Sequence, residues 1–256
     1  MTTRSFARKQ WQGNDRQRNL FDSYIPLPNI PLPFFASPLL AFETLGGIFR
    51  DSLGQIFSFF RTPKPGEVFA YHAGMKLGVF IERDGVLNQA RVERQHQVSP
   101  LMLEEFKINP GVAPLLKKLK AAGMTIIVTT NQPGISRGYL PRRELDRMHD
   151  LLRRSLPMID DLLICAHDDT DHCPCRKPRP GLFSEAAFKH RLTLDRSFVI
   201  SDKWQDAEAA RLVGATSLLI NSPWIGSAHH DFVLPDFSAV VEKILQLQGT
   251  TASVAA

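Results

Sequence analysis

The sequence has few cysteines, no long apolar run and only a small excess of charge. Its 256 residues include 3 Cys, 3 Trp and 3 Tyr, and all the cysteines fall between positions 165 and 175. An odd, tightly grouped set of cysteines is unlike the disulfide framework of a secreted domain. No uncharged apolar run reaches the length of about 18 residues that a membrane span needs, and the first twenty residues hold no apolar signal segment. We therefore expect a cytoplasmic protein with reduced thiols or a metal site.

The charge balance excludes few functions. Lys and Arg number 31 against 26 Asp and Glu, a net charge of +5, and 43% of the residues are hydrophobic. This composition is ordinary for a globular protein and excludes collagen-like and wholly disordered classes. The mild positive charge suits anionic ligands but is too small to predict nucleic-acid binding.

Residues 1–75 read as an N-terminal extension, because they hold ten of the 17 Phe and seven of the 18 Pro. The first 18 residues form a basic arm, which is interpreted as a solvated terminus or as an organelle-targeting peptide. The segment YIPLPNIPLP that follows predicts an extended, polyproline-like strap, since proline fixes φ and removes a hydrogen-bond donor.

Residues 39–60 predict an amphipathic helix within this extension, followed by a linker. Apolar side chains recur at helical spacing along one face: Phe42, Leu45, Phe49, Leu53, Ile56 and Phe60. Such a stripe packs on a protein surface of its own or another chain or lies at a membrane interface, and a marginal helix is the third interpretation because of Gly46 and Gly47. The extension is thus a predicted attachment to a protein partner or a membrane surface.

From residue 76 to about 250 the pattern predicts an α/β doubly wound domain with a parallel sheet, followed by a tail at 251–256. The expected strands are 76–82, 124–130, 161–166, 197–201 and 215–220. The expected helices lie near 112–122, 142–155, 181–190, 205–213 and 237–247. Apolar strands between amphipathic helices are typical of a sheet buried on both faces, and ligands bind such sheets beyond the carboxyl ends of the strands.

Polar motifs follow the expected strands. Glu82 and Asp84 come after the first strand, and two carboxylates at this spacing can hold a divalent cation while one acts as an acid or base. After the second strand come Thr130, Asn131 and Gln132, whose hydroxyl and amide groups suit a phosphate.

Further charged residues extend this predicted site. Asp202 and Lys203 follow the fourth strand, and Asp206 stands at a helix start, where helix-terminus electrostatics is the alternative interpretation. Arg176 and Lys177 provide cations suited to gripping a phosphoryl group.

The cysteine segment predicts a closed tetrahedral zinc site that rigidifies a short loop. Three thiolates and one imidazole supply four ligands: Cys165, His167, Cys173 and Cys175. His172 is an alternative ligand, although coordination by its neighbour Cys173 would strain it.

Taken in order, FIERDGVLN, VTTNQPGISRGYL, CxHx5CxC with CRKPRPG, and SDKWQD resemble the haloacid dehalogenase (HAD) superfamily. They most resemble its zinc-loop branch, which contains the heptose-bisphosphate and histidinol-phosphate phosphatases. The resemblance covers residues 76 to about 250 and implies a magnesium-dependent phosphomonoesterase that works through an aspartyl-phosphate. The extension lies outside it.

The resemblance also implies a role for each matched residue. Glu82 stands at the nucleophile position and Asp84 is the acid/base. Mg²⁺ is implied at Glu82, Asp84 (through its carbonyl) and Asp202, and structural zinc at the cysteine segment. The phosphoryl group is implied to contact Thr130, Arg176 and Lys177, and the rest of the substrate to contact Asn131, Gln132 and Lys203, with Asp206 supporting the site from behind.

Two departures from the family pattern leave the activity open. Glu82 replaces the family's Asp, and a misplacement of about 1 Å can cost roughly a hundredfold in rate. Residues 90–93 also differ from the substrate segment of the heptose phosphatases. The first hypothesis is therefore a phosphatase for a small sugar-like metabolite. The second is an impaired pseudo-phosphatase that serves as a binding or structural subunit through residues 1–75, and a nucleic-acid 3′-phosphatase ranks last.

Overall fold

The computed structural model describes residues 74–227 and 229–254. The predicted basic arm, proline-rich strap and helix at 39–60 lie outside these residues, and these interpretations stay predictions. Within the described part, no helix has the length and apolar character needed to cross a bilayer.

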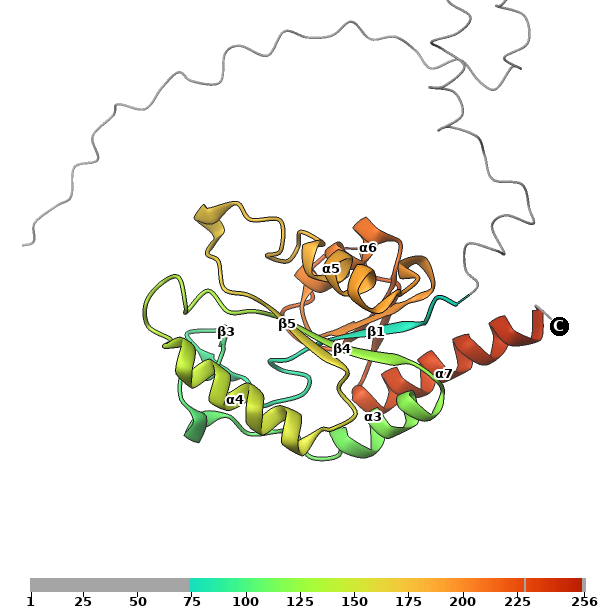
Figure 1. Cartoon of the computed structure of the whole chain (residues 1–256), viewed down its shortest axis with the longest axis horizontal. Coiled ribbons are helices and arrows are strands. Elements are labelled where there is room, and N and C mark those ends of the chain that lie inside the picture. Colours follow the sequence, from blue (N-terminus) through green and yellow to red (C-terminus); the bar gives the residue numbers. More distant parts are fainter. Residues whose placement is uncertain (1–73, 228, 255–256) are drawn as a thin grey trace, which may run out of the picture. The chain divides into compact units, whose positions relative to one another are not determined.

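A six-stranded parallel sheet forms the centre of the described residues (Figure 1). Its strands are β1 (Gly78–Glu82), β4 (Thr125–Asn131), β5 (Asp161–Cys165), β6 (Phe198–Ser201), β7 (Thr216–Ile220) and β8 (Phe232–Leu234). They are arranged in the order β5-β4-β1-β6-β7-β8, and each neighbouring pair is parallel. The chain adds β4 on one side of β1 and β6 on the other, so the order reverses at β1. In open sheets this reversal opens a crevice for ligands beyond the carboxyl ends.

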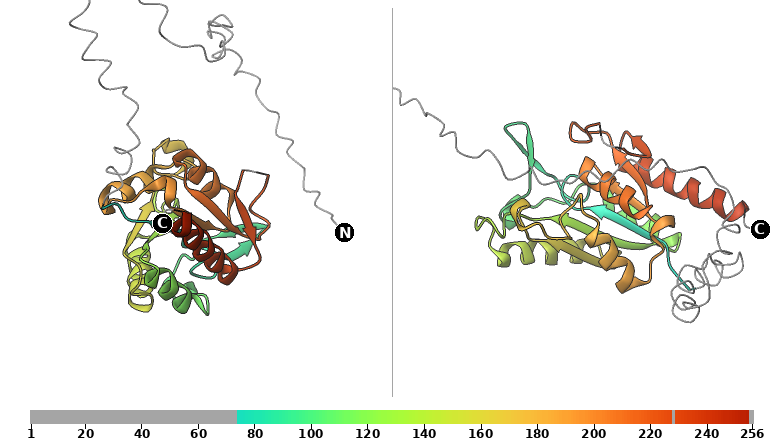
Figure 2. Two further views of the ribbon diagram at one scale, coloured as in Figure 1. Left: turned by 90° about the vertical axis from the view of Figure 1, so that its right-hand side faces the viewer. Right: turned by 90° about the horizontal axis from the view of Figure 1, so that it is seen from above.

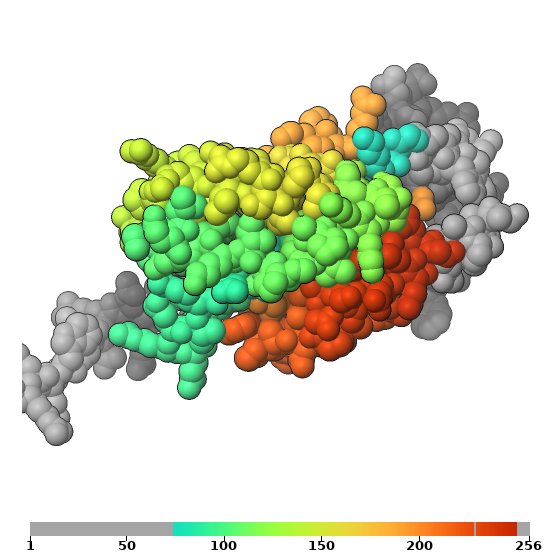
Figure 3. Space-filling view, turned by 90° about the horizontal axis from the view of Figure 1, so that it is seen from below, coloured from blue at the N-terminus to red at the C-terminus, as the bar shows by residue number. Residues whose placement is uncertain are grey.

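Helices cover both faces of the sheet. They are α3 (Val112–Ala121), α4 (Arg142–Ser155), α5 (Gly181–His190), α6 (Trp204–Val213) and α7 (Phe237–Val254). α5 and α6 cover one face, and α3, α4 and α7 cover the other (Figures 1 and 2). Figure 3 shows this second face, on which α3 and α7 lie side by side.

The central strands are apolar throughout because both of their faces are buried. Val79 and Ile81 of β1 belong to the core under α3, α4 and α7, whereas Phe80 between them belongs to the core under α5 and α6. The ring of Phe80 lies 4.8 Å from that of Phe183 on α5. This alternation explains why β1 reads as one continuous hydrophobic run until its last residue, Glu82.

The sequence-based assignment of five strands and five helices is confirmed, and the predicted fold class is correct. Three short strands were missed: β8 and the hairpin of β2 (Arg91–Glu93) and β3 (His96–Val98). Each of these strands is only three residues long, which is too short to show the alternating pattern that predicts a strand. In addition, α7 runs to Val254, so part of the predicted tail is helical.

Candidate active site

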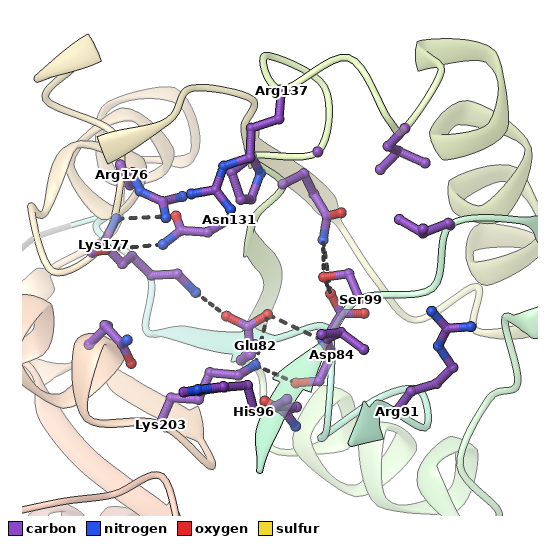
Figure 4. Close-up of a pocket in the computed structure, with 18 of the residues that line it drawn as sticks. Glu82, Asp84, Arg91, His96, Ser99, Asn131, Arg137, Arg176, Lys177 and Lys203 are labelled. Atoms are coloured by element: carbon purple, nitrogen blue, oxygen red, sulfur yellow. Dashed lines mark hydrogen bonds and ion pairs between the residues drawn. The ribbon is translucent and has the colours of Figure 1, made fainter. Parts of the chain in front are cut away.

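A cavity of about 500 Å³ opens beyond the carboxyl ends of β1 and β4 (Figure 4). The β2–β3 hairpin forms one wall, and the loop before α5 and the start of α6 supply cations and a carboxylate. Both predicted catalytic residues, Glu82 and Asp84, line it. Five of the six residues predicted for phosphate and substrate also line it: Asn131, Gln132, Arg176, Lys177 and Lys203. The sixth, Thr130, is fully buried beneath its floor. Tertiary structure therefore gathers the predicted motifs around one space.

Glu82 ends β1 with its carboxylate buried, 3% exposed, at the floor of the cavity. Oε1 accepts hydrogen bonds from the backbone N–H of Asp84 at 3.2 Å and from Oγ1 of Thr130 at 3.1 Å. Oε2 accepts one from Nζ of Lys177. Burial alone would raise the pKa of Glu82, but the ammonium groups of Lys177 and Lys203 hold that pKa below its ordinary value. Glu82 is therefore an ionised carboxylate whose two oxygens are both engaged.

Asp84 is likewise saturated with donors. Arg83, fully buried, donates to both of its oxygens at 2.9–3.0 Å. Asn88 donates to Oδ1 at 3.0 Å, and Ser99 and Gln132 donate to Oδ2 at 2.7 and 2.9 Å. Burial opposes the charge, but Arg83 first and then Lys203 hold the pKa of Asp84 well below its usual range. The side chain is fixed and ionised in this arrangement.

Lys177 connects the loop before α5 to the floor of the cavity. It is 3% exposed, and besides Glu82 its Nζ donates to Oδ1 of Asp206 at 2.6 Å and to the Thr129 carbonyl at 3.2 Å. Burial lowers the pKa of Lys177, but Asp206 and Glu82 outweigh this and raise it. Burial also raises the pKa of Asp206 to about 6. Asp206 thus holds the Lys177 ammonium at the cavity, and the supporting role expected of Asp206 stays a prediction.

The three residues predicted to suit a phosphate, Thr130, Asn131 and Gln132, have different contacts. Thr130 and Gln132 face Glu82 and Asp84, with Nε2 of Gln132 also donating to Oγ1 of Thr130 at 2.9 Å. Asn131 instead holds the backbone of Lys177: Nδ2 donates to its carbonyl at 3.0 Å, and Oδ1 accepts from its N–H at 3.2 Å. Asn131 therefore fixes the lysine loop in place with the groups that were expected to hold substrate.

Three oxygen atoms that could bind a metal ion lie near the ammonium group of Lys203. Nζ of Lys203 donates to the Asp84 carbonyl at 2.7 Å and lies 3.7 Å from Oε1 of Glu82 and 3.5 Å from Oδ1 of Asp202. Oδ1 of Asp202 is buried without a hydrogen bond, and burial raises the pKa of Asp202. These oxygens, including the Asp202 oxygen that accepts no hydrogen bond, fit a magnesium ion. The same oxygens now surround the Lys203 ammonium, so a divalent cation and this lysine compete for them.

Gly85 makes possible the turn that follows Glu82 and Asp84. Its φ is +96°, and a Cβ there would lie 2.2 Å from Oδ2 of Asp202 and 2.4 Å from Nε2 of Gln97. Only glycine permits both this conformation and this close approach.

The mouth of the cavity carries arginines. Arg176 is held by Asp169, with Nε 2.6 Å from Oδ1, and donates to the His167 carbonyl at 3.3 Å. Arg137 pairs with Asp168 on the same loop. Both arginines line the cavity and place positive charge at its entrance (Figure 4).

The predicted metal ligands come together beside this loop. One atom from each of Cys165, His167, Cys173 and Cys175 lies within 4.8 Å of every other. The separations from Sγ of Cys165 to Nδ1 of His167 and to Sγ of Cys173 are both 3.6 Å. These values match a tetrahedron with metal–sulfur bonds of about 2.3 Å. The alternative ligand His172 does not belong to this cluster.

Several residues of the site could not be found by motif. Gln97, on the hairpin, donates from Nε2 to Oδ2 of Asp202 at 2.7 Å, and Ser99 follows the hairpin to reach Asp84. No spacing rule links residues 97 and 202. Arg83 belongs to the motif FIERDGVLN, but nothing in the sequence predicts that its side chain is buried against Asp84.

Comparison with known proteins agrees with this geometry. A HAD-hydrolase-like family model matches residues 174–239. The D-glycero-beta-D-manno-heptose-1,7-bisphosphate 7-phosphatase of Helicobacter pylori is 31% identical over 173 residues, which cover 65% of this chain and 96% of that protein. The bifunctional histidine biosynthesis protein HisB of Legionella pneumophila is 34% identical over 57% of this chain and 42% of its own length.

Solved structures extend the likeness to three dimensions. The crystal structure of D,D-heptose 1,7-bisphosphate phosphatase from B. bronchiseptica, complexed with magnesium and phosphate, superposes with a TM-score of 0.59 at 28% identity. The match covers 66% of this chain and 98% of that one. The chain therefore belongs to the HAD-like hydrolase family that includes the D-glycero-beta-D-manno-heptose-1,7-bisphosphate 7-phosphatases.

Proposed function

We propose that the protein is a magnesium-dependent phosphomonoester hydrolase that acts on a small, sugar-like phosphorylated metabolite. The observation that carries this proposal is the convergence of Thr130, Lys177 and the Asp84 N–H on one buried carboxylate at the cavity floor. A hydroxyl, an ammonium and a backbone N–H aimed at one point suit a phosphoryl group. The relatives named above are phosphatases of a sugar bisphosphate, which supports the same reaction class.

The reaction assigns one task to each carboxylate. An oxygen of Glu82 attacks phosphorus, the ester P–O bond breaks, and Asp84 gives its proton to the departing alkoxide. Asp84 then takes a proton from water, whose oxygen attacks phosphorus and releases phosphate from Glu82. Asp84 is ionised without substrate, so it must take up one proton from solvent or from a monoanionic ester as the ester binds. The nearby phosphate charge favours this uptake by opposing ionisation.

Other groups stabilise charge and position. Thr130 and Lys177 hold the equatorial phosphoryl oxygens, and Arg176 attracts the anionic substrate at the entrance. Glu82, the Asp84 carbonyl and Asp202 are the residues that would hold Mg²⁺, which neutralises phosphoryl charge when bound. We assign structural zinc to Cys165, His167, Cys173 and Cys175, because the three-thiolate, one-imidazole set closes a tetrahedron and leaves no open position.

Heptose bisphosphate itself is not the proposed substrate. The hairpin wall of the cavity carries Arg91, Glu93 and His96, and the segment from residue 90 to 93 departs from the family's substrate segment. Arg91 is paired with Glu93 and Glu105, and Arg137 is paired with Asp168. A wall of such mixed charge suits the hydroxyl groups of a compact polyol phosphate.

Phosphate release with Mg²⁺ tests this function. The full-length protein is offered an aryl phosphate and a panel of sugar phosphates, beside Asp84→Asn as the inactive control. We expect turnover by the native protein and a loss of at least about a hundredfold in Asp84→Asn, because the general acid is removed. Equal rates in the two proteins would trace the activity to a contaminant and reject the proposal.

A second candidate function is a pseudo-phosphatase that binds a partner through residues 1–75. The observation that favours it is the engagement of both Glu82 oxygens by internal donors. In that case the native protein is inert and Glu82→Asp alone turns over. The comparison of these two proteins on one substrate panel distinguishes the two functions.

A further inference from the structure

The three donors that meet at Glu82 come from three separate segments of the chain. The Asp84 N–H follows β1, Thr130 is the last residue but one of β4, and Lys177 precedes α5. Each donor group is buried or nearly so: Asp84 and Lys177 are 3% exposed and Thr130 is fully buried. Figure 4 shows Lys177 and Asp84 approaching Glu82 from opposite sides. Such a convergence of donors is an oxyanion site, and the oxyanion that fills it is a side chain of the protein.

The length of Glu82 decides this arrangement. An aspartate is shorter by one carbon–carbon bond of about 1.5 Å, so its carboxylate would stop short of Thr130 and Lys177 and leave a gap between them. A tetrahedral oxyanion fits such a gap, because it accepts from the same kinds of donor.

We infer that the Glu82 carboxylate is a built-in ligand of the phosphate site, an internal mimic of the phosphoryl group that phosphate or a phosphate ester must displace in order to bind. This inference rests on the proposed function only in taking the three donors as the phosphoryl site. It requires no turnover, and it holds for a slow hydrolase and for a pseudo-phosphatase alike.

Tethering makes the internal ligand a strong competitor. A group attached beside its site acts at an effective concentration of about millimolar or higher. Displacement also removes Glu82 from Lys177, whose buried ammonium then keeps Asp206 and the Thr129 carbonyl as partners. Lys177 therefore keeps a carboxylate partner whether Glu82 or phosphate occupies the site. Displacement of Glu82 does not leave the buried ammonium unpaired.

Simple charge repulsion is the competing explanation, since any anion at position 82 disfavours phosphate. Two substitutions separate the explanations. Glu82→Gln keeps the length and removes the charge, whereas Glu82→Asp keeps the charge and shortens the side chain. Occupancy predicts that Glu82→Asp gains phosphate affinity, and repulsion predicts that Glu82→Gln gains it and Glu82→Asp does not.

The experiment is a titration of the full-length, zinc-loaded protein with inorganic phosphate in a buffer without magnesium, followed by calorimetry and by the shift of the thermal unfolding midpoint. The variants are Glu82→Asp, Glu82→Gln and Glu82→Asp combined with Lys177→Met. Glu208→Asp is the matched control, because it makes the same change on the surface of α6, where Glu208 pairs with Arg211.

We expect Glu82→Asp to bind phosphate at least about tenfold more tightly than the native protein and Glu208→Asp to match the native protein. Adding Lys177→Met should remove the gain. Equal affinities of the native protein and Glu82→Asp would overturn the inference, as would a gain confined to Glu82→Gln or one that survives Lys177→Met. If Glu82→Asp does not fold, the second test adds Thr130→Val to Glu82→Gln, which removes one of the three donors. This double variant should bind phosphate more weakly than Glu82→Gln alone. Equal binding by the two would overturn the inference. The absence of turnover in the native protein bears on the proposed hydrolase alone.

Discussion

Arg83 donates from Nη1 to Nε2 of His149 on α4 at 2.8 Å, and both side chains are buried, at 0% and 4% exposure. A guanidinium has no acceptor, so Nε2 of His149 is unprotonated and the ring proton is on Nδ1. Burial first, and Arg83 second, lower the pKa of His149 to about 3. The neutral histidine thereby links α4 to the cation that fixes Asp84.

This neutral histidine should make the protein sensitive to mild acid. Its pKa is lowered on folding, so the unfolded chain binds the proton more strongly and stability falls as the pH drops below about 6.5. Between pH 7.5 and 5 we expect His149 to account for a loss of about 2 kcal/mol in the free energy of unfolding. Urea unfolding at the two pH values should show a smaller loss in His149→Gln. His229→Gln is the control, with a side chain 59% exposed, and should behave as the native protein does.

Arg83 should matter for stability as well as for the site. Arg83→Met removes the cation from a buried pair and leaves Asp84 charged among neutral donors, which costs about 3–5 kcal/mol. Arg211, with a side chain 49% exposed in its pair with Glu208, provides the control, and Arg211→Met should leave the free energy of unfolding close to that of the native protein. Chemical denaturation measures both. A loss below about 1 kcal/mol in Arg83→Met would contradict the view that Asp84 depends on this cation.

The metal cluster should depend on His167 and not on His172. His167→Asn should reduce the zinc content of the purified protein and lower its thermal unfolding midpoint, because a tetrahedral site loses one of four ligands. His172 has a positive φ of 46°, which asparagine tolerates, so His172→Asn makes the same change without added strain. Metal analysis by mass spectrometry should find full zinc occupancy in that control. Equal zinc loss in both variants would reject the assigned ligand set.

Gly85 should be more sensitive than other glycines of positive φ. Gly123, with φ of +79°, has no atom within 4 Å of an added Cβ, so Gly123→Ala introduces backbone strain alone, about 1 kcal/mol. Gly85→Ala adds a collision with Asp202 and Gln97, and we expect a loss about 1–3 kcal/mol larger. Thermal unfolding of the pair measures the difference. Equal effects would show that Asp202 and Gln97 move aside without cost.

The fold was predictable because its signals are local. Each long strand is a buried apolar run, each long helix has an amphipathic period, and polar motifs mark where the strands end. The sheet order then brings separate motifs together: Glu82 stands opposite Thr129 in the parallel register of β1 and β4, so Thr130 lies beside the end of β1. The four candidate metal ligands were equally readable, because they occupy one short segment whose spacing limits their geometry.

The sequence by itself thus determined the family, the parallel sheet and the identity of the groups at the site. Only the tertiary structure decided what those groups contact: Asn131 holds the lysine loop, Gln97 reaches Asp202, and Glu82 fills the oxyanion site with its own carboxylate. The physical reason is that the spacing of a motif determines only the loop on which a side chain lies. The hydrogen-bond partners of that side chain depend on which other segments are packed around it in the folded protein. A buried polar group must find a donor or acceptor, and the nearest one comes from whichever distant segment the packed core brings there.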